Sequence, residues 1–215
     1  MRRALVHLVA LVLAGGLLAM PVAASAEEYA AKLRRAVAEL PMAPEVRKGY
    51  AREKFLHWID ADDDGCSTRE EVLLFEATTS TTVSGTCTIE DGRWFSYYDR
   101  QDWTDPADVD IDHLVPLAEA WDSGARRWRP TVRSRFANDL RDRRSLVAVT
   151  DNVNQSKSDR DPADWLPDHS RCRYVREWVA VKHRWELQVD RAEKRVLRDL
   201  AGSCDNTRIR VRIAR

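Results

Sequence analysis

The chain has 215 residues, of which 44% are hydrophobic and 33% charged, and its 35 basic residues balance 35 acidic ones. This length is enough to bury the core of one domain. The neutral balance excludes a protein that attracts nucleic acid through its bulk charge alone.

The first 26 residues have the pattern of a signal peptide. Arg2 and Arg3 precede an almost uncharged stretch over residues 4–24, and small residues follow up to Ala26. We expect cleavage after Ala26 and a secreted protein without stable membrane association. A retained membrane anchor is the alternative, because the apolar run approaches the roughly 20 residues that span a bilayer. The mature chain, 27–215, keeps 33 basic and 35 acidic residues, a net charge of −2.

The mature chain alternates between helical and strand-like patterns. Apolar residues at helical spacing predict helices over 28–40, 44–59, 72–75, 116–123, 132–141, 175–185 and 191–200. Short strands are expected over 109–113 and 145–149, a hairpin over 86–98 with its turn at Asp91-Gly92, and a loop or edge strand over 78–85. Residues 150–158 are polar and turn-prone. These elements predict one α+β domain that is mostly helical.

Four cysteines follow the signal peptide: Cys66, Cys87, Cys172 and Cys204. An even number in an oxidising compartment indicates disulfides. Three pairings are possible, and proximity in the sequence favours Cys66 with Cys87 and Cys172 with Cys204. A free reactive thiol is the alternative.

Residues 60–71 match the pattern of a calcium-binding loop. The matching residues are Asp60, Asp62, Asp64, Gly65, Cys66 and Glu71. They place carboxylates at positions one, three, five and twelve and the turn glycine at position six, between segments that we expect to be helical. Ser67 stands where paired loops have an apolar residue, so an unpaired loop with weak, structural Ca²⁺ binding is predicted. An acidic turn that caps the following helix is the alternative.

A carboxylate and an imidazole stand side by side at the end of the strand expected over 109–113. Adjacent strand residues point to opposite faces, so Asp112 and His113 can reach one site only if the strand bends or ends there. Pro116 is compatible with such a bend. Asp112 offers oxygen to a hard cation, and His113 can accept a proton from water near neutral pH.

A second polar group follows the strand expected over 145–149. An amide oxygen at Asn154 can complete a metal site, and the Lys157 ammonium can hold a phosphate. The sequence therefore places an Asp-His pair, a strand and an Asn-x-x-Lys group in one order.

These motifs resemble the HNH endonuclease family. The resemblance is carried by Asp112-His113-Leu-Val-Pro116, by residues 145–149 and by Asn154-Gln-Ser-Lys157-Ser-Asp159. Within that family the chain most resembles secreted bacterial HNH proteins related to the DUF1524 group. This resemblance extends over about 55–204 and includes all four cysteines. The Asp-His and Asn-x-x-Lys motifs also resemble the HNH domain of RNA-guided CRISPR nucleases. The family resemblance implies a ββα-metal core over about 109–157 inside the domain 27–215.

The resemblance also implies a mechanism. Asp112 and Asn154 would bind one divalent metal, Mg²⁺ or Mn²⁺, His113 would activate the attacking water, and Lys157 would neutralise a phosphate. These four residues form the expected catalytic set of a secreted, metal-dependent endonuclease. We expect it to hydrolyse phosphodiester bonds in DNA, and no protein partner is evident.

One position departs from the family pattern. The middle Asn of the motif, which orients the histidine, falls at Ser145, and Asn138 or Asn152 could substitute for it. Ser145 and the near-neutral charge favour an alternative function, a non-catalytic extracellular calcium-binding protein with a degenerate HNH core. An RNase or a toxin-like nuclease is a further alternative.

Arginines supply local positive charge on this neutral chain. One group surrounds Trp128, between residues 126 and 135, and another lies between residues 208 and 215. Either group can meet a phosphate backbone, although solvated surface arginines remain the alternative.

Overall fold

The structure, a computed structural model, describes residues 27–214. The predicted signal peptide lies outside them. The described chain forms the α+β fold that the sequence predicts. Within these residues no helix combines the length and the apolar character needed to cross a bilayer.

Helices and strands alternate along the chain. The helices are α1 (Leu33–Glu39), α2 (Thr68–Glu76), α3 (Leu117–Asp122), α4 (Pro130–Ala137), α5 (Asp151–Lys157), α6 (Arg171–Arg184) and α7 (Arg191–Ser203), with short 3₁₀ helices η1 (Arg52–Lys54), η2 (Pro106–Asp108) and η3 (Ala125–Arg127). The strands are β1 (Glu28–Lys32), β2 (Thr82–Ser84), β3 (Thr88–Asp91), β4 (Trp94–Ser96), β5 (Gln101–Trp103), β6 (Val109–His113), β7 (Leu146–Thr150) and β8 (Arg208–Arg212).

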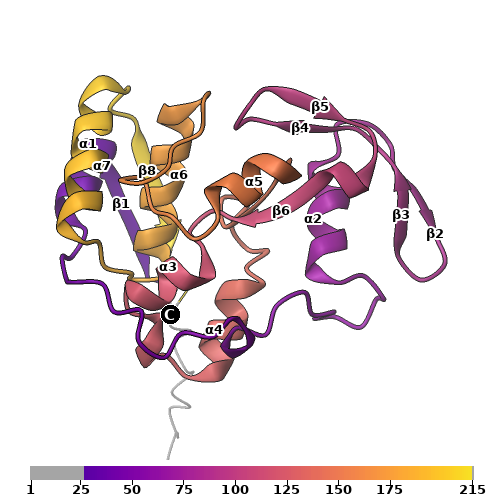
Figure 1. The fold of residues 1–215 in the computed structure, drawn as a ribbon, viewed down its shortest axis with the longest axis horizontal. Coiled ribbons are helices and arrows are strands. Elements are labelled where there is room, and N and C mark those ends of the chain that lie inside the picture. Colours follow the sequence, from indigo (N-terminus) through magenta and orange to yellow (C-terminus); the bar gives the residue numbers. More distant parts are fainter. Residues whose placement is uncertain (1–26, 215) are drawn as a thin grey trace, which may run out of the picture.

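The strands pair into two-stranded antiparallel sheets. The pairs are β1 with β8, β2 with β3, β4 with β5 and β6 with β7. In Figure 1, β1 and β8 lie with α1, α6 and α7 at one end of the molecule, and α2 lies with β2–β5 at the other. The hairpin β6–β7 and helix α5 lie between these two groups.

The β6–β7 hairpin is buried from both sides. Val109 and Ile111 of β6 belong to one hydrophobic cluster, which also contains Trp94 and the Cys66–Cys87 pair. Val147 and Val149 of β7 belong to the larger cluster, built mainly by α1, α3, α6 and α7. All five residues of β7 are buried. This explains why the sequence shows a continuous apolar run instead of an alternating one.

One helix expected near the N-terminus is shorter than predicted, since only residues 33–39 of it form α1, and another is wrong. The first five residues of the helix predicted over 28–40 form β1, because their partner β8 offers a complete antiparallel ladder. The helix predicted over 44–59 is absent apart from η1. This segment instead follows the surface of α3, where Trp121 Nε1 donates to the Lys48 carbonyl and Arg47 pairs with Asp122. Tertiary contacts here override local helix propensity.

Two further expectations are corrected in the middle of the chain. Residues 151–157, predicted to be turn-prone, form α5 directly after β7. The hairpin β2–β3 turns around Gly85, whose φ is 56°, whereas Asp91-Gly92 connects β3 to β4. Asp91 instead accepts hydrogen bonds from Thr82.

Both predicted disulfides are confirmed. Cys66 pairs with Cys87, which fastens the 60–71 loop to the β2–β3 hairpin. Cys172 pairs with Cys204, which joins the start of α6 to the end of α7.

Candidate functional site

The residues of β6 divide between two faces of the hairpin. Asp110 and Asp112 lie on the face toward α5, where they contact residues of that helix. His113 follows Asp112 directly, and its ring contacts Ala137 and Trp58 instead. The two side chains therefore point to opposite sides of the strand, as adjacent strand residues do.

Asp112 is a buried carboxylate with a buried counter-ion. Its side chain is 5% exposed, and that of Lys157 is wholly buried. Lys157 Nζ donates to Asp112 Oδ1 at 2.8 Å, and the Tyr98 hydroxyl donates to Oδ2 at 2.6 Å. Burial raises the pKa of Asp112, while Lys157 and Tyr98 oppose that shift. The ion pair joins β6 to α5.

Lys157, predicted to contact a phosphate, has its ammonium in the interior of the protein. Besides Asp112, its ammonium donates to the His113 carbonyl oxygen at 3.1 Å. Burial lowers the pKa of Lys157, and the Asp112 carboxylate opposes the shift. Lys157 therefore binds the Asp112 carboxylate and the backbone of β6.

Asn154 lies at the same face of β6 as Asp112, where it hydrogen-bonds Asp110. Asn154 Nδ2 donates to Asp110 Oδ2 at 3.1 Å, which leaves the amide oxygen of Asn154 available. Two carboxylates and an amide oxygen on one face fit a hard divalent cation by their chemistry. Both oxygens of Asp112 already accept hydrogen bonds, so Asp110 and Asn154 offer the more open donors.

His113 is held in one tautomer. Its Nε2 lies 2.9 Å from the Ala137 carbonyl oxygen, and because a carbonyl only accepts, Nε2 carries the proton. Among the described residues no hydrogen bond engages Nδ1. Burial lowers the pKa of His113 to about 3, so the ring is neutral at physiological pH. A neutral imidazole with one free nitrogen can accept a proton.

The group that lies against His113 Nε2 is the Ala137 carbonyl oxygen, whereas the HNH pattern predicts an asparagine side chain there. Ser145 instead donates its hydroxyl to Asp139 at 2.8 Å. Asn138 bonds Leu56, Ile59, Thr68 and Ser134. Neither of these side chains contacts the His113 ring, and Asn152 is exposed. The sequence carries no signal for this contact, because a backbone carbonyl is available at every residue.

Three of the four carboxylates that form the calcium pattern of the 60–71 loop lie close together. Oxygens of Asp60, Asp62 and Asp64 lie within 4.8 Å of one another. Asp60 accepts from the backbone N–H of Asp64 and Gly65, which closes the loop. Burial and these three aspartates raise the pKa of Glu71. The expected entering helix is absent, and α2 begins after the loop with a capping box at Ser67.

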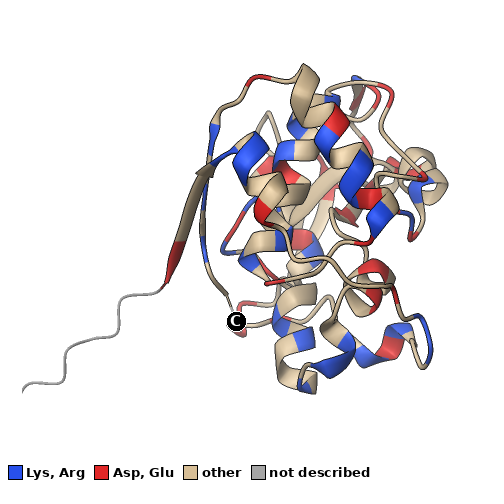
Figure 2. Ribbon diagram, turned by 90° about the vertical axis from the view of Figure 1, so that its left-hand side faces the viewer, with Lys and Arg blue, Asp and Glu red and all other residues tan. Residues whose placement is uncertain are grey.

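Arginines line an open pocket of about 800 Å³ between α4, the 138–144 loop and the β1–β8 sheet. The charged residues of its lining are Arg135, Arg141, Arg144, Arg184, Arg210, Arg212, Glu28, Asp139 and Asp142, six positive against three negative. Lysine and arginine positions elsewhere are interspersed with acidic ones (Figure 2). Ile59 and Asn138 also line the pocket, and they adjoin Trp58 and Ala137, which contact the His113 ring.

Residues 68–200 match the family described as GmrSD restriction endonucleases, C-terminal domain. The chain belongs to this family. The match spans α2 through α7 and so contains the β6–β7 hairpin, α5 and the arginine-rich segment after α3. The family is one of nucleases, in agreement with the predicted class.

One relative of the chain is described as a secreted protein. An uncharacterized secreted protein of Arthroderma benhamiae (strain ATCC MYA-4681 / CBS 112371) is 47% identical over 158 residues, covering 73% of this chain and 76% of that protein. No solved structure matches the chain. The relative is fungal, so the expected restriction to bacterial proteins has no support, whereas the two disulfides agree with an extracellular location.

The burial of His113 predicts an unusual titration. Its folded pKa, about 3, lies below the ordinary value of 6.5, so the unfolded chain binds more protons between these values. The contribution of this residue to stability is therefore present above pH 6.5 and is lost as the pH falls toward 3. NMR titration of the ring protons should show no transition near pH 6.5, with a His113→Gln variant to assign the signal. A midpoint near 6.5 would contradict the buried, neutral ring.

Proposed function

We propose that the protein is a secreted, metal-dependent endonuclease of the HNH type that hydrolyses phosphodiester bonds in DNA. The observation that carries the proposal is the His113 ring, which is fixed through Nε2 by the Ala137 carbonyl and has Nδ1 free. It stands at the end of β6, on the side of the strand opposite to the face that holds Asp110, Asp112 and Asn154. The membership in a family of restriction endonuclease domains supports a nuclease.

His113 acts as the general base in this proposal. In the neutral ring Nδ1 has a lone pair that can accept the proton of the attacking water, and the burial that keeps the ring neutral also lowers its basicity. The bond to Ala137 fixes the plane of the ring and stabilises the imidazolium that forms. A positioned base of this kind contributes a rate factor of roughly 10² to 10⁴.

The α5-facing side of β6 is the proposed metal face. Asp112 and Asn154, with Asp110 beside them, would hold Mg²⁺ or Mn²⁺. When bound, the cation supplies stabilisation of the charge that develops on the phosphate and the leaving oxygen. Lys157 and Tyr98 oppose the rise that burial causes in the pKa of Asp112, and they fix the orientation of its carboxylate. In this proposal Lys157 is a positioning residue, and its predicted contact with a phosphate stays a prediction.

The arginine-lined pocket is the proposed surface for the DNA backbone. Its lining carries three more positive than negative charges, on a chain whose total charge is zero. Arg210 and Arg212 are exposed on β8. The pocket reaches Ile59 and Asn138, neighbours of the residues that contact His113. A phosphate backbone in the pocket would therefore approach the proposed base.

A non-catalytic calcium-binding protein is the second candidate. The observation that favours it is the engagement of both Asp112 oxygens by Lys157 and Tyr98, which a catalytic cation would have to share. The gathered carboxylates of Asp60, Asp62 and Asp64 support structural Ca²⁺ binding in either case. The two functions differ in whether a folded, oxidised protein cleaves nucleic acid.

Cleavage of plasmid DNA tests the enzyme directly. The oxidised mature protein should nick the plasmid with Mg²⁺ or Mn²⁺ and not with EDTA. His113→Ala should lower the rate by roughly 10²-fold or more, because the base is removed. His169→Ala, a histidine outside the hairpin, is the matched control and should cleave normally. A folded wild-type protein that leaves the plasmid intact supports the non-catalytic candidate.

Binding of DNA tests the arginine pocket without cleavage. In EDTA, the Arg210→Gln/Arg212→Gln double variant should bind a labelled duplex more weakly in fluorescence anisotropy. The slope of log K against log salt should fall by about 1 to 2, because two phosphate contacts are lost. The control is Arg191→Gln/Arg195→Gln, which removes the same charge from exposed positions of α7. Equal effects of the two double variants would refute the assignment of this surface.

Thermal unfolding tests the calcium loop. The melting temperature should be higher in millimolar Ca²⁺ than with excess chelator, because only the folded loop brings the carboxylates together. Asp62→Asn/Asp64→Asn should reduce this difference. The amide oxygen introduced by Asp64→Asn can still accept the hydrogen bond that the Asp64 carboxylate accepts from the Cys66 backbone N–H. An unchanged melting temperature in Ca²⁺ and chelator would show that the loop is only an acidic turn.

A further inference from the structure

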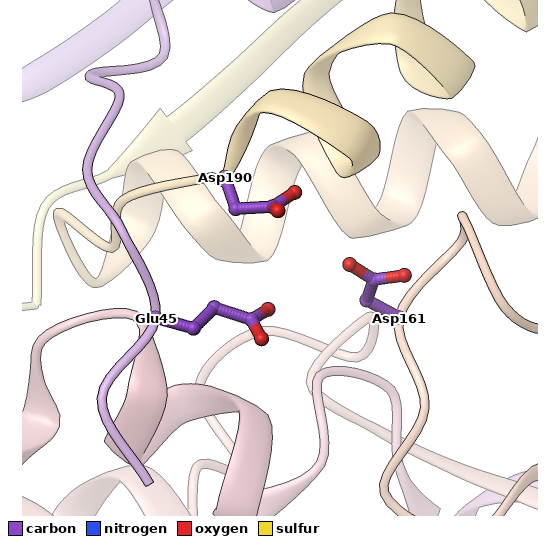
Figure 3. A group of neighbouring side chains, drawn as sticks. All are labelled: Glu45, Asp161 and Asp190. Carbon is purple, nitrogen blue, oxygen red and sulfur yellow. The ribbon is translucent and has the colours of Figure 1, made fainter.

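A second group of carboxylates lies away from the β6–β7 hairpin. Figure 3 shows Glu45, from the segment after α1, Asp161, from the loop after α5, and Asp190, at the start of α7, with their carboxyl groups directed toward one common space. One oxygen of each lies within 4.8 Å of the others. Residues far apart in the sequence thus converge on one point.

The group extends into α3. Oxygens of Glu45, Glu119 and Asp122 also lie within 4.8 Å of one another. Glu119 and Asp122 are each 2% exposed, and Asp161 is 8% exposed. Carboxylates from three further segments of the chain therefore surround Glu45, and three of them are buried.

Nearby cations compensate only part of this charge. Lys182 Nζ donates to Glu119 at 2.5 Å and to Glu193 at 3.1 Å, so it is shared with a further carboxylate. Arg47 donates to Asp122 Oδ2 at 2.7 Å and is shared with Asp159. Burial and the surrounding carboxylates raise the pKa of Glu45 to about 7, and burial with Glu119 and Asp190 raises that of Asp161 to about 6. The carboxylates of this site therefore carry more negative charge than the neighbouring Lys182 and Arg47 can balance.

An unpartnered oxygen independently indicates a missing ligand. Arg47 engages Oδ2 of Asp122, but the buried Oδ1 has no hydrogen-bond partner among the described residues. A buried carboxylate oxygen without a partner is costly, by several times the net value of an ordinary hydrogen bond. A cation with its bound water would satisfy this oxygen.

We propose that Glu45, Asp161 and Asp190, together with Glu119 and Asp122, form a binding site for Ca²⁺ that is separate from the metal face of β6. All donors are carboxylate oxygens, which a hard cation prefers. Ca²⁺ accepts six to eight oxygens in flexible geometry, whereas Mg²⁺ requires a near-ideal octahedron. The ion would fasten the irregular segment around Glu45 to α3 and α7, and this inference does not depend on the proposed nuclease activity.

Calorimetry on the oxidised mature protein tests the site. The Asp62→Asn/Asp64→Asn background weakens the calcium loop, so that the remaining binding of Ca²⁺ reports this group of carboxylates. Adding Glu45→Gln should weaken the remaining binding at least tenfold. Glu53→Gln, an exposed carboxylate of the same segment, is the matched control and should leave it unchanged. No Ca²⁺ binding in the background variant, or equal binding after Glu45→Gln, would overturn the proposal.

Thermal unfolding separates a bound ion from shared protons. With chelator, Glu45→Gln should melt at the same temperature as the wild type or higher, because it removes a like charge. Ca²⁺ should then raise the melting temperature of the Asp62→Asn/Asp64→Asn background and not that of the triple variant. Protons would hold the carboxylates instead if the background protein became more stable between pH 7.5 and 6 and did not respond to Ca²⁺. That result would also overturn the proposal.

Discussion

The ion pair between Asp112 and Lys157 is the interaction on which the central part of the molecule depends. Both groups leave water, so the pair is stable only because Tyr98 and the His113 carbonyl complete its hydrogen bonds. It fixes α5 on β6 and so brings Asn154 to Asp110. Because this ammonium is engaged in the interior, the proposed endonuclease would take the positive charge for a phosphate backbone from other residues. In the proposal these are the arginines on and beside β8.

The buried hairpin separates two chemical environments. On one side of β6, carboxylate and amide oxygens gather against α5; on the other, His113 lies among Trp58, His57 and the Ala137 carbonyl. The apolar side chains of both hydrophobic clusters hold the strand between them. Oxygen donors and a neutral imidazole are thereby kept at one strand end without a direct contact between them. That separation protects the histidine from the carboxylates, which would otherwise raise its pKa.

Local patterns predicted the elements that local residues determine. The alternating residues of β6, the apolar run of β7, the amphipathic α6 and α7, and the disulfides were predictable because their signals lie within a short stretch of sequence. Residues 28–32 also have helical spacing, but β8 supplies a strand partner that no local window contains. Asp112, Asn154 and Lys157 were predicted from their motif, whereas Tyr98 and Asp110, which hydrogen-bond Asp112 and Asn154, were not predicted as their partners. Glu45 and the carboxylates around it were not predicted as a site, because they come from four distant segments, none with a metal-binding spacing of its own.

The pairing of β1 with β8 has a consequence for synthesis and export. Glu28 lies opposite Arg212, so the earliest strand of the domain is translated long before the strand that receives it. Until then the Tyr29 and Ala31 backbone has no ladder, and the apolar residues of β8, Ile209 and Val211, are not yet available to the main core. The β1–β8 sheet can therefore form only after β8 has been made. Export of the predicted precursor that began before this point would carry a chain in which this sheet had not yet formed.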